Sequence, residues 1–185
     1  MTTIDTRAAV PLARTLRRVY FSRFGFALIW AVLLAFVAPN AAPLLTVLVI
    51  IYPLVDAFSV LTELRAAGTT SRSRASEIIN IVSSVLAAVA LGWASFVSPG
   101  AVLAVWGVWA VLSGASQLVT GLIRRKLGGQ VPLIFSGGLS VLVGFAFLAQ
   151  GLGGSTMVTS IAGYAALGGV LFLISALRLT RSARA

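Results

Sequence analysis

Residues 44–65 read LLTVLVIIYPLVDAFSVLTELR, an apolar run from Leu44 to Thr62 that leads to a basic residue, Arg65. The run is close to the roughly 20 residues that a helix needs to cross the roughly 30 Å hydrocarbon layer of a bilayer. It contains a single charged side chain, Asp56, which follows Pro53 by three residues. The stretch predicts a membrane-spanning helix that carries an acid in its interior.

Five further apolar runs of similar length occur along the chain. The six runs extend approximately over Phe24 to Ala38, Leu44 to Thr62, Glu77 to Val97, Ala101 to Ile123, Val131 to Ala149 and Thr156 to Leu177. Hydrophobic residues make up 59% of the 185 residues and charged residues only 10%, whereas a soluble domain has about 25% charged residues. The mean hydropathy is +1.04. We therefore predict an all-α integral membrane protein with six transmembrane helices.

The basic residues divide the connections between these runs into two classes. Three connections carry no charge, at residues 39–43, 98–100 and 150–155. Clusters of arginine or lysine lie before the first run and after the second, fourth and sixth runs. Because basic loops stay on the cytoplasmic side, this pattern predicts that both termini are cytoplasmic. The expected parts are a basic cytoplasmic N-terminal segment at 1–22, a transmembrane domain at 23–180 and a short basic cytoplasmic tail at 181–185.

An offset of 60 residues relates the first two runs to the next two. Pro39 and Pro99 are separated by this offset, and so are Arg65 and Arg125. The fifth and sixth runs fit as a third copy in which a glycine-rich turn replaces the proline turn. The sequence therefore predicts three helical-hairpin repeats of the same orientation, related by an axis along the membrane normal. The hairpins are expected at about 23–64, 77–123 and 131–178.

The second repeat displays the pattern in full. Residues 105–126 read VWGVWAVLSGASQLVTGLIRRK, a span with Gly and Trp that follows a proline turn and ends in a basic loop. With this repeated pattern, residues 20–178 resemble the HdeD-type acid-resistance membrane proteins, which are bacterial six-span proteins built of a short repeat. The resemblance implies a multi-pass protein of the bacterial inner (plasma) membrane with a role in acid or envelope stress. It implies no catalytic motif.

Cysteine and histidine are absent and only four acidic residues occur, which removes most catalytic and metal-binding chemistry. Thiolate chemistry, zinc or haem ligation and a histidine proton shuttle are excluded by composition. Four scattered acids also make a poor cage for a hard cation. We expect no enzyme activity, no cofactor and no metal site. The net charge of +10 lies in the loops, which points to membrane lipids and not to nucleic acid as partner.

Asp56 is the main candidate for a functional residue. It lies nine residues before Arg65, about 13 Å from the cytoplasmic end of its helix and within the hydrocarbon layer. A charge at that depth is costly, and none of the six runs contains a Lys or Arg in its interior. Residues 19–21 are expected to extend the first span past Arg23, whose long side chain snorkels to the interface. We therefore expect Asp56 to be neutral at pH 7 or to face water in a cavity. Pro53 lacks an amide hydrogen and predicts a helix kink beside it.

Further polar residues fall at a similar depth in neighbouring spans. They include Gln117 in the fourth span and Ser83 and Ser84 in the third. Together with Asp56 they predict one polar layer, which is either a proton- or ligand-binding site or the wall of a substrate cavity. Interhelical hydrogen bonding alone is the other interpretation. Glu63 lies on nearly the same face as Asp56, and is either a surface partner of the arginine that follows it or the mouth of a path to Asp56.

The basic clusters are expected to orient the protein and to contact anionic lipid headgroups at the cytoplasmic face. The expected anchors are Arg17, Arg18, Arg124, Arg125 and Lys126. Small residues recur at helical spacing in the last three spans, among them Gly114, Gly144 and Gly169, and predict close helix packing. Packing within one chain and packing between the copies of a homo-oligomer both fit this spacing.

These features leave three function classes. The first is a non-enzymatic protein of the acid or envelope stress response with a protonatable intramembrane site at Asp56. The second is a small transporter or channel with a polar pathway past Asp56 and Gln117. The third is an accessory subunit of a membrane complex.

Overall fold

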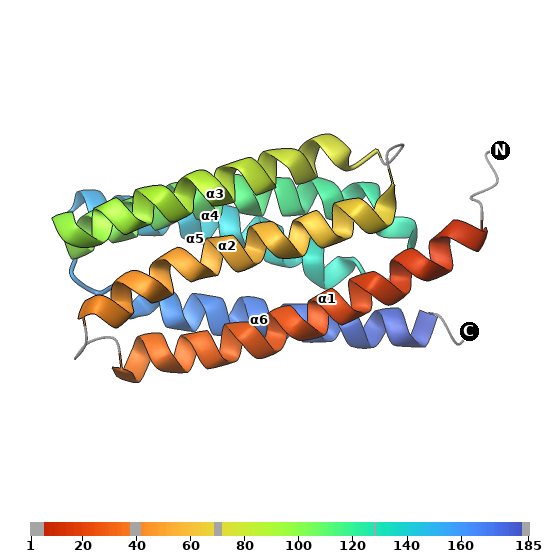
Figure 1. Cartoon of the computed structure of the whole chain (residues 1–185), viewed down its shortest axis with the longest axis horizontal. Coiled ribbons are helices and arrows are strands. Elements are labelled where there is room, and N and C mark those ends of the chain that lie inside the picture. The colour runs from red at the N-terminus through yellow and green to blue at the C-terminus, as the bar shows by residue number, and fades with distance from the viewer. Residues whose placement is uncertain (1–5, 38–41, 69–71, 128, 183–185) are drawn as a thin grey trace.

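The computed structural model describes residues 6–37, 42–68, 72–127 and 129–182 and folds them into a bundle of helices (Figure 1). No strand occurs within these ranges. Six helices are long and apolar enough to cross a membrane. They are α1 (Thr6–Val32), α2 (Ala42–Ala67), α3 (Arg74–Val97), α4 (Pro99–Ile123), α5 (Val131–Leu152) and α6 (Ser160–Ser182). A π-helical turn, Leu33–Val37, follows α1, and a 3₁₀ turn, Arg125–Leu127, follows α4. The predicted all-α fold with six helices of membrane-spanning length is confirmed.

The first helix begins earlier than the sequence predicted. α1 starts at Thr6, so most of the segment expected at 1–22 belongs to the same helix as the first span. Leu16 and Tyr20 on this part of α1 are fully buried, in a cluster with apolar side chains of α6. Because this apolar face continues the helix, Arg23 lies inside α1 and not at its end.

α2 remains helical through Pro53. Proline lacks an amide hydrogen, which frees the carbonyl of Val49 one turn earlier. The backbone carbonyl oxygen of the preceding residue, Leu48, accepts a hydrogen bond from Trp30 Nε1 at 2.7 Å. This bond ties α1 to α2 close to the proline.

A single residue, Ser98, separates α3 from α4. Its side chain accepts a hydrogen bond from the backbone nitrogen of Ala101 at 3.0 Å. Pro99 takes the first helical position, where no amide hydrogen is needed. The corresponding turn of the first hairpin, around Pro39, lies outside the described residues. The repeat of three hairpins stays a prediction.

The six helices close into a ring. Each helix packs against its neighbours in sequence, and α1 also packs along α6. The most extensive contacts are those of α4 with α5, α1 with α6 and α2 with α3, and each of these joins two different predicted hairpins. α1 begins and α6 ends at the same end of the bundle, on the right in Figure 1.

α4 and α5 approach closely because glycines face each other along both helices. α4 carries a glycine at every seventh position over 100–121, and α5 does so over 137–151. A Cβ atom on Gly107 would lie 2.5 Å from the backbone nitrogen of Leu148 and 2.6 Å from the carbonyl oxygen of Gly144. Small residues therefore allow backbone contact here, and at these positions the contact lies within one chain.

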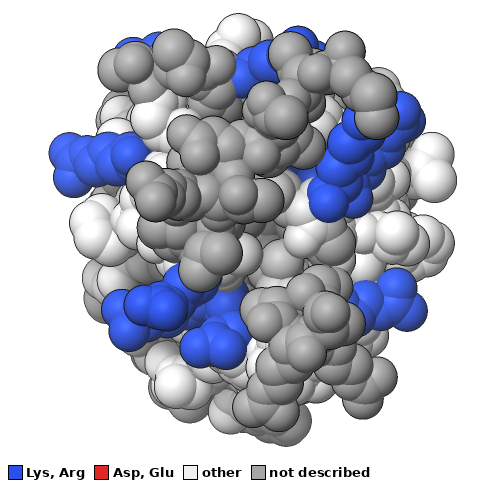
Figure 2. Space-filling model, turned by 90° about the vertical axis from the view of Figure 1, so that its right-hand side faces the viewer, with Lys and Arg blue, Asp and Glu red and all other residues white. Residues whose placement is uncertain are grey.

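The end of the bundle where α1 begins and α6 ends is called the basic end. Figure 2 looks onto it and shows Lys and Arg side chains around it, with no Asp or Glu visible among the described residues of this view. Exposed basic residues near this end include Arg18, Arg65, Arg72, Arg74, Arg125, Lys126 and Arg178. Between the two ends, the helices expose large apolar side chains such as Ile29, Phe58 and Leu142. A surface of this kind is suited to contact with lipid.

Candidate functional site

Asp56 has a cationic partner inside the bundle. Arg23 of α1 forms an ion pair with it, with Nη2 donating to Asp56 Oδ1. The other oxygen, Oδ2, accepts hydrogen bonds from Asn80 Nδ2 at 2.6 Å and from Ser84 Oγ at 3.0 Å, both on α3. The side chains of Arg23 and Asp56 are only 13% and 7% exposed. The expectation that Asp56 has no cationic partner at its depth is therefore wrong.

Arg23 lies in the interior of α1, with helical residues on both sides of it. Its side chain therefore faces Asp56 on the neighbouring helix. Its guanidinium carbon also lies 4.1 Å from the ring centroid of Phe172 on α6, in a cation–π contact. The ion pair and the aromatic ring together stabilise a cation away from water. The prediction that Arg23 snorkels to the membrane interface is wrong, because its guanidinium instead contacts Asp56 and Phe172 inside the bundle.

A second ion-pair group lies nearer the basic end. Arg124, the residue that follows α4, donates from Nη1 to Glu63 Oε2 at 2.8 Å and from Nη2 to Glu77 Oε1. All three side chains are almost fully buried. The prediction of Arg124 as a headgroup anchor is therefore wrong, and so is that of Glu63 as a surface partner of Arg65. Both carboxylates turn inward because the guanidinium provides the charge that they need.

The other predicted anchors lie near the surface. Arg18, Arg125 and Lys126 are exposed, and Arg17 is half-buried. Contact of these residues with anionic headgroups stays a prediction.

Arg23 and the carboxylates of both ion-pair groups line one small cavity. It has a volume of about 30 Å³ and is lined by Arg23, Asp56, Val60, Glu63, Glu77, Asn80, Ser116, Gln117, Thr120, Leu133 and Phe172. A water molecule needs roughly 10 to 15 Å³ on this measure, so the cavity has room for about two. Glu77 Oε2 is buried and has no hydrogen-bond partner among the described residues. We call Arg23, Asp56, Glu63, Glu77 and Arg124 the charge cluster.

The structure brings together some of the predicted polar residues and separates others. Ser84 bonds directly to Asp56, and Gln117 lines the same cavity while its Nε2 donates to the carbonyl oxygen of Leu133 at 3.1 Å. Ser83 instead lines an apolar groove on the outer surface and donates to the carbonyl of its own helix. The polar layer therefore exists around Asp56, but the two arginines that pair with its carboxylates, Arg23 and Arg124, were not predicted to belong to it.

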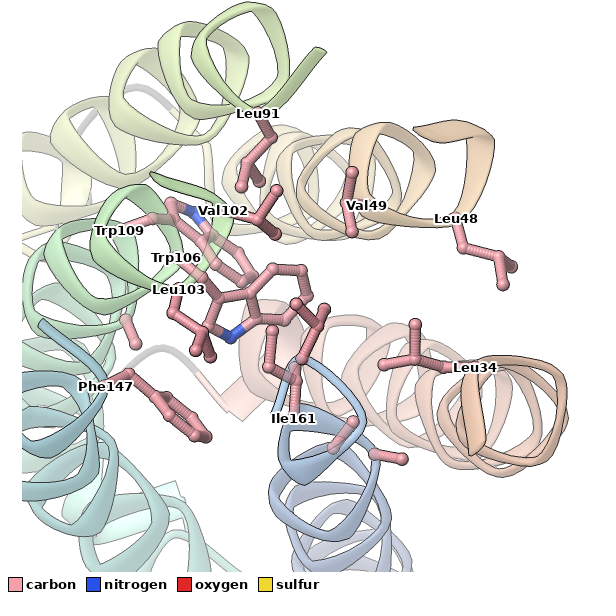
Figure 3. Close-up of a cluster of buried hydrophobic side chains, with 14 of the residues drawn as sticks. Leu34, Leu48, Val49, Leu91, Val102, Leu103, Trp106, Trp109, Phe147 and Ile161 are labelled. Carbon is pink, nitrogen blue, oxygen red and sulfur yellow. The ribbon is translucent and has the colours of Figure 1, made fainter. Parts of the chain in front are cut away.

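Aromatic side chains fill the interior beyond the cluster. Trp30, Tyr52, Trp106 and Trp109 form a connected group with ring centroids 4.6 to 5.9 Å apart, which we call the aromatic plug. Figure 3 shows Trp106 and Trp109 pointing into the bundle among buried apolar residues. Tyr52 precedes Asp56 by one turn on α2, on the side away from the basic end. The aromatic plug therefore lies between the charge cluster and the end of the bundle opposite the basic end. Trp109 Nε1 donates to Ser84 Oγ at 2.9 Å and links the plug to Asp56.

Ser84→Ala is expected to lower the free energy of unfolding by about 1 to 3 kcal/mol, because Trp109 loses its acceptor and Asp56 loses a donor in a buried site. The matched control is Ser83→Ala, because the Ser83 hydroxyl donates to the Asn80 carbonyl oxygen one turn earlier and has no bond to Asp56 or Trp109 among the described residues. Denaturant unfolding in a mild detergent measures both. Equal losses for the two variants would contradict the described hydrogen bonds.

No family model, no curated protein and no solved structure matches the chain. The resemblance to HdeD-type proteins therefore rests on the sequence pattern. Among the described residues, no three acidic side chains meet in a group that could hold a metal ion. Arg124 lies between Glu63 and Glu77, and Arg23 pairs with Asp56, so the charge cluster is an ion-pair network.

Proposed function

We propose that the chain is a non-enzymatic bacterial inner-membrane protein of the HdeD type that acts in acid or envelope stress. Its basic end and both termini lie in the cytoplasm, and the charge cluster is the proton-sensitive element. One observation carries the proposal. Three buried carboxyl groups share two buried guanidinium groups beside a cavity with room for water.

The two ion-pair groups differ in how they accommodate a proton. Arg124 binds two carboxylates, so it keeps one counter-ion when either Glu63 or Glu77 is protonated. Arg23 pairs with Asp56 alone among the described residues, so protonation of Asp56 leaves a buried cation without a counter-charge. Arg124 therefore stays paired after one proton is accepted beside it, whereas Arg23 depends on a single carboxylate.

Breaking that pair changes the packing of several helices. Arg23 lies on α1, Asp56 on α2, and the donors Asn80 and Ser84 on α3. Asp56 is thus the point where three helices meet through polar contacts. Its protonation weakens the attachment of α1 to α2 and α3, and the bond between Ser84 and Trp109 carries the change into the aromatic plug.

A transporter or channel is the second candidate. It is favoured by Asp56 and Gln117, which line one cavity as a polar pathway requires. The aromatic plug stands between this cavity and the opposite end of the bundle, and the cavity has room for only about two waters. These features favour a proton-sensitive element over a pathway. Ion flux into liposomes that Asp56→Ala abolishes would favour the second candidate.

The double variant Arg23→Met/Asp56→Leu is expected to stay folded and to lose acid protection. Replacing a buried ion pair by apolar residues is often neutral or stabilising, whereas removing one partner costs about 3 to 5 kcal/mol. The thermal unfolding midpoint of the double variant should therefore fall less in acid than that of the wild type. Survival of acid exposure is measured in cells that lack the wild-type protein and express either form.

Glu63→Gln is compared with Asp56→Asn for stability at neutral pH, because Arg124 keeps Glu77 as counter-ion when Glu63 is replaced. Glu63→Gln is expected to change stability at neutral pH by less than about 1 kcal/mol, and Asp56→Asn by several times more. A folded double variant that protects cells from acid as well as the wild type would overturn the proposal.

A further inference from the structure

The outer surface between α3 and α4 is hollowed into a long apolar groove. Its volume is about 620 Å³. The rim carries large side chains such as Ile78, Val82 and Val108, whereas Ala87, Ala90 and Ala104 leave space between the helices. Ile78 and Val82 are exposed, and the groove lies within the parts of α3 and α4 that are long and apolar enough to cross a membrane. The groove therefore faces the hydrocarbon layer.

The length of the groove identifies its occupant. On α3 it runs from Ile78 to Ala90, which is about 18 Å along the helix axis. This is little more than half of the roughly 30 Å hydrocarbon layer. The α4 residues of the groove, Ala104 to Leu112, lie mostly in the half of α4 nearer the opposite end, so the groove begins near the basic end and extends past the middle of the bundle. A transmembrane helix of a partner would need a groove along the whole layer. An acyl chain of a lipid in the leaflet at the basic end fits the observed length.

The charge at the end of the groove identifies the headgroup. Arg74 is exposed and lies one helical turn before Ile78, at the end where an acyl chain enters. Arg125 and Lys126 are exposed after α4, which borders the groove on its other side. A basic residue near the membrane surface favours an anionic headgroup.

We propose that the α3–α4 groove is a binding site for an anionic phospholipid of the leaflet at the basic end. One acyl chain lies in the groove and the phosphate is bound by Arg74. Trp109 lines the groove and donates to Ser84, which itself donates to Asp56. The bound lipid therefore contacts the hydrogen-bonded chain that leads to the charge cluster.

The test uses the full chain in phosphatidylcholine nanodiscs that contain phosphatidylglycerol with brominated acyl chains. Bromine quenches nearby tryptophan, and the difference between wild type and Trp109→Phe isolates Trp109 from the other tryptophans. Half-maximal quenching is expected at an about fivefold lower mole fraction of brominated phosphatidylglycerol than of brominated phosphatidylcholine. Arg74→Gln should remove this preference, whereas Arg18→Gln on α1 should retain it.

A second measurement does not depend on the tryptophan variant. Native mass spectrometry should show phosphatidylglycerol retained on the wild type after transfer to detergent. Ala90→Leu, which fills the groove, should lose it, and Ala146→Leu, at an exposed position on α5 outside the groove, should keep it. Equal quenching by the two lipids with no effect of Arg74→Gln would overturn the proposal.

A partner helix in the groove would also overturn it. Because the chain has no cysteine, Ala90→Cys provides a single thiol in the groove. Efficient disulfide-linked dimers of this variant in nanodiscs would show that a second copy covers the groove. Monomers that keep the lipid preference would support the lipid.

Discussion

Gly137→Ala is expected to lower the free energy of unfolding by about 1 to 3 kcal/mol, although it adds one methyl group to an apolar helix. A Cβ atom at this position would lie 2.7 Å from the backbone nitrogen of Leu118 and 2.8 Å from the carbonyl oxygen of Gly114. Both are backbone atoms of α4, which cannot turn aside as a side chain can. The substitution must push α4 and α5 apart along their contact, the most extensive between helices of the ring.

The next residue provides the control. A Cβ atom on Gly138 would meet nothing within 4 Å, and alanine has the better helix propensity. Gly138→Ala is therefore expected to leave stability unchanged or to raise it slightly. Thermal unfolding in one detergent, followed by circular dichroism, compares the pair. A Gly137→Ala variant as stable as Gly138→Ala would show that α4 and α5 are not in backbone contact.

Arg124→Met is expected to destabilise the protein by about 3 to 5 kcal/mol, because it leaves Glu63 and Glu77 buried without a counter-charge. Adding Glu63→Gln and Glu77→Gln to this variant should recover much of the loss, since the uncompensated charges are then removed. Denaturant unfolding at neutral pH measures both forms.

The adjacent Arg125 is the matched control for Arg124. It is exposed, so Arg125→Met should change the free energy of unfolding by less than about 1 kcal/mol. Similar losses for the two arginine variants, or no recovery in the triple variant, would contradict the buried position of Arg124 between the two carboxylates.

The six helices were predictable because apolar runs such as Leu44 to Thr62 depend only on length and composition. The close packing around Gly114 and Gly144 was also indicated by small residues at helical spacing. The seven-residue glycine repeats of α4 and α5 were present in the sequence. Their common seven-residue period identifies α4 and α5 as the two helices that face each other.

The charge cluster was only partly predictable. Asp56 and Ser84 stand out by their depth, but the long side chain of Arg23 is predicted to snorkel to the interface, because arginines near the end of a span usually do so. The true start of α1 depends on the burial of Leu16 and Tyr20 against α6, a tertiary contact that no local pattern reveals. Asn80 does indicate the polar site in the sequence, because it lies one turn from Ser84 on the same face of α3.

Arg124 was missed for a different reason. It begins a run of three basic residues, and such a run usually lies at the membrane surface. Arg124 directly follows the last residue of α4, and its side chain turns into the bundle. Arg125 and Lys126 belong to the 3₁₀ turn that comes next, and their side chains are exposed. The carboxylates that bind Arg124 lie 61 and 47 residues away in sequence.

The central claim is that the carboxyl groups beside Arg124 take up a proton inside the bundle. Infrared difference spectra between about pH 8 and about pH 5, just above the usual range of carboxyl groups, detect the carbonyl band of a protonated carboxyl directly. The wild type should gain this band in acid, and the Glu63→Gln/Glu77→Gln variant should not. A wild-type spectrum without the band, or a band that persists unchanged in the double variant, would contradict the account.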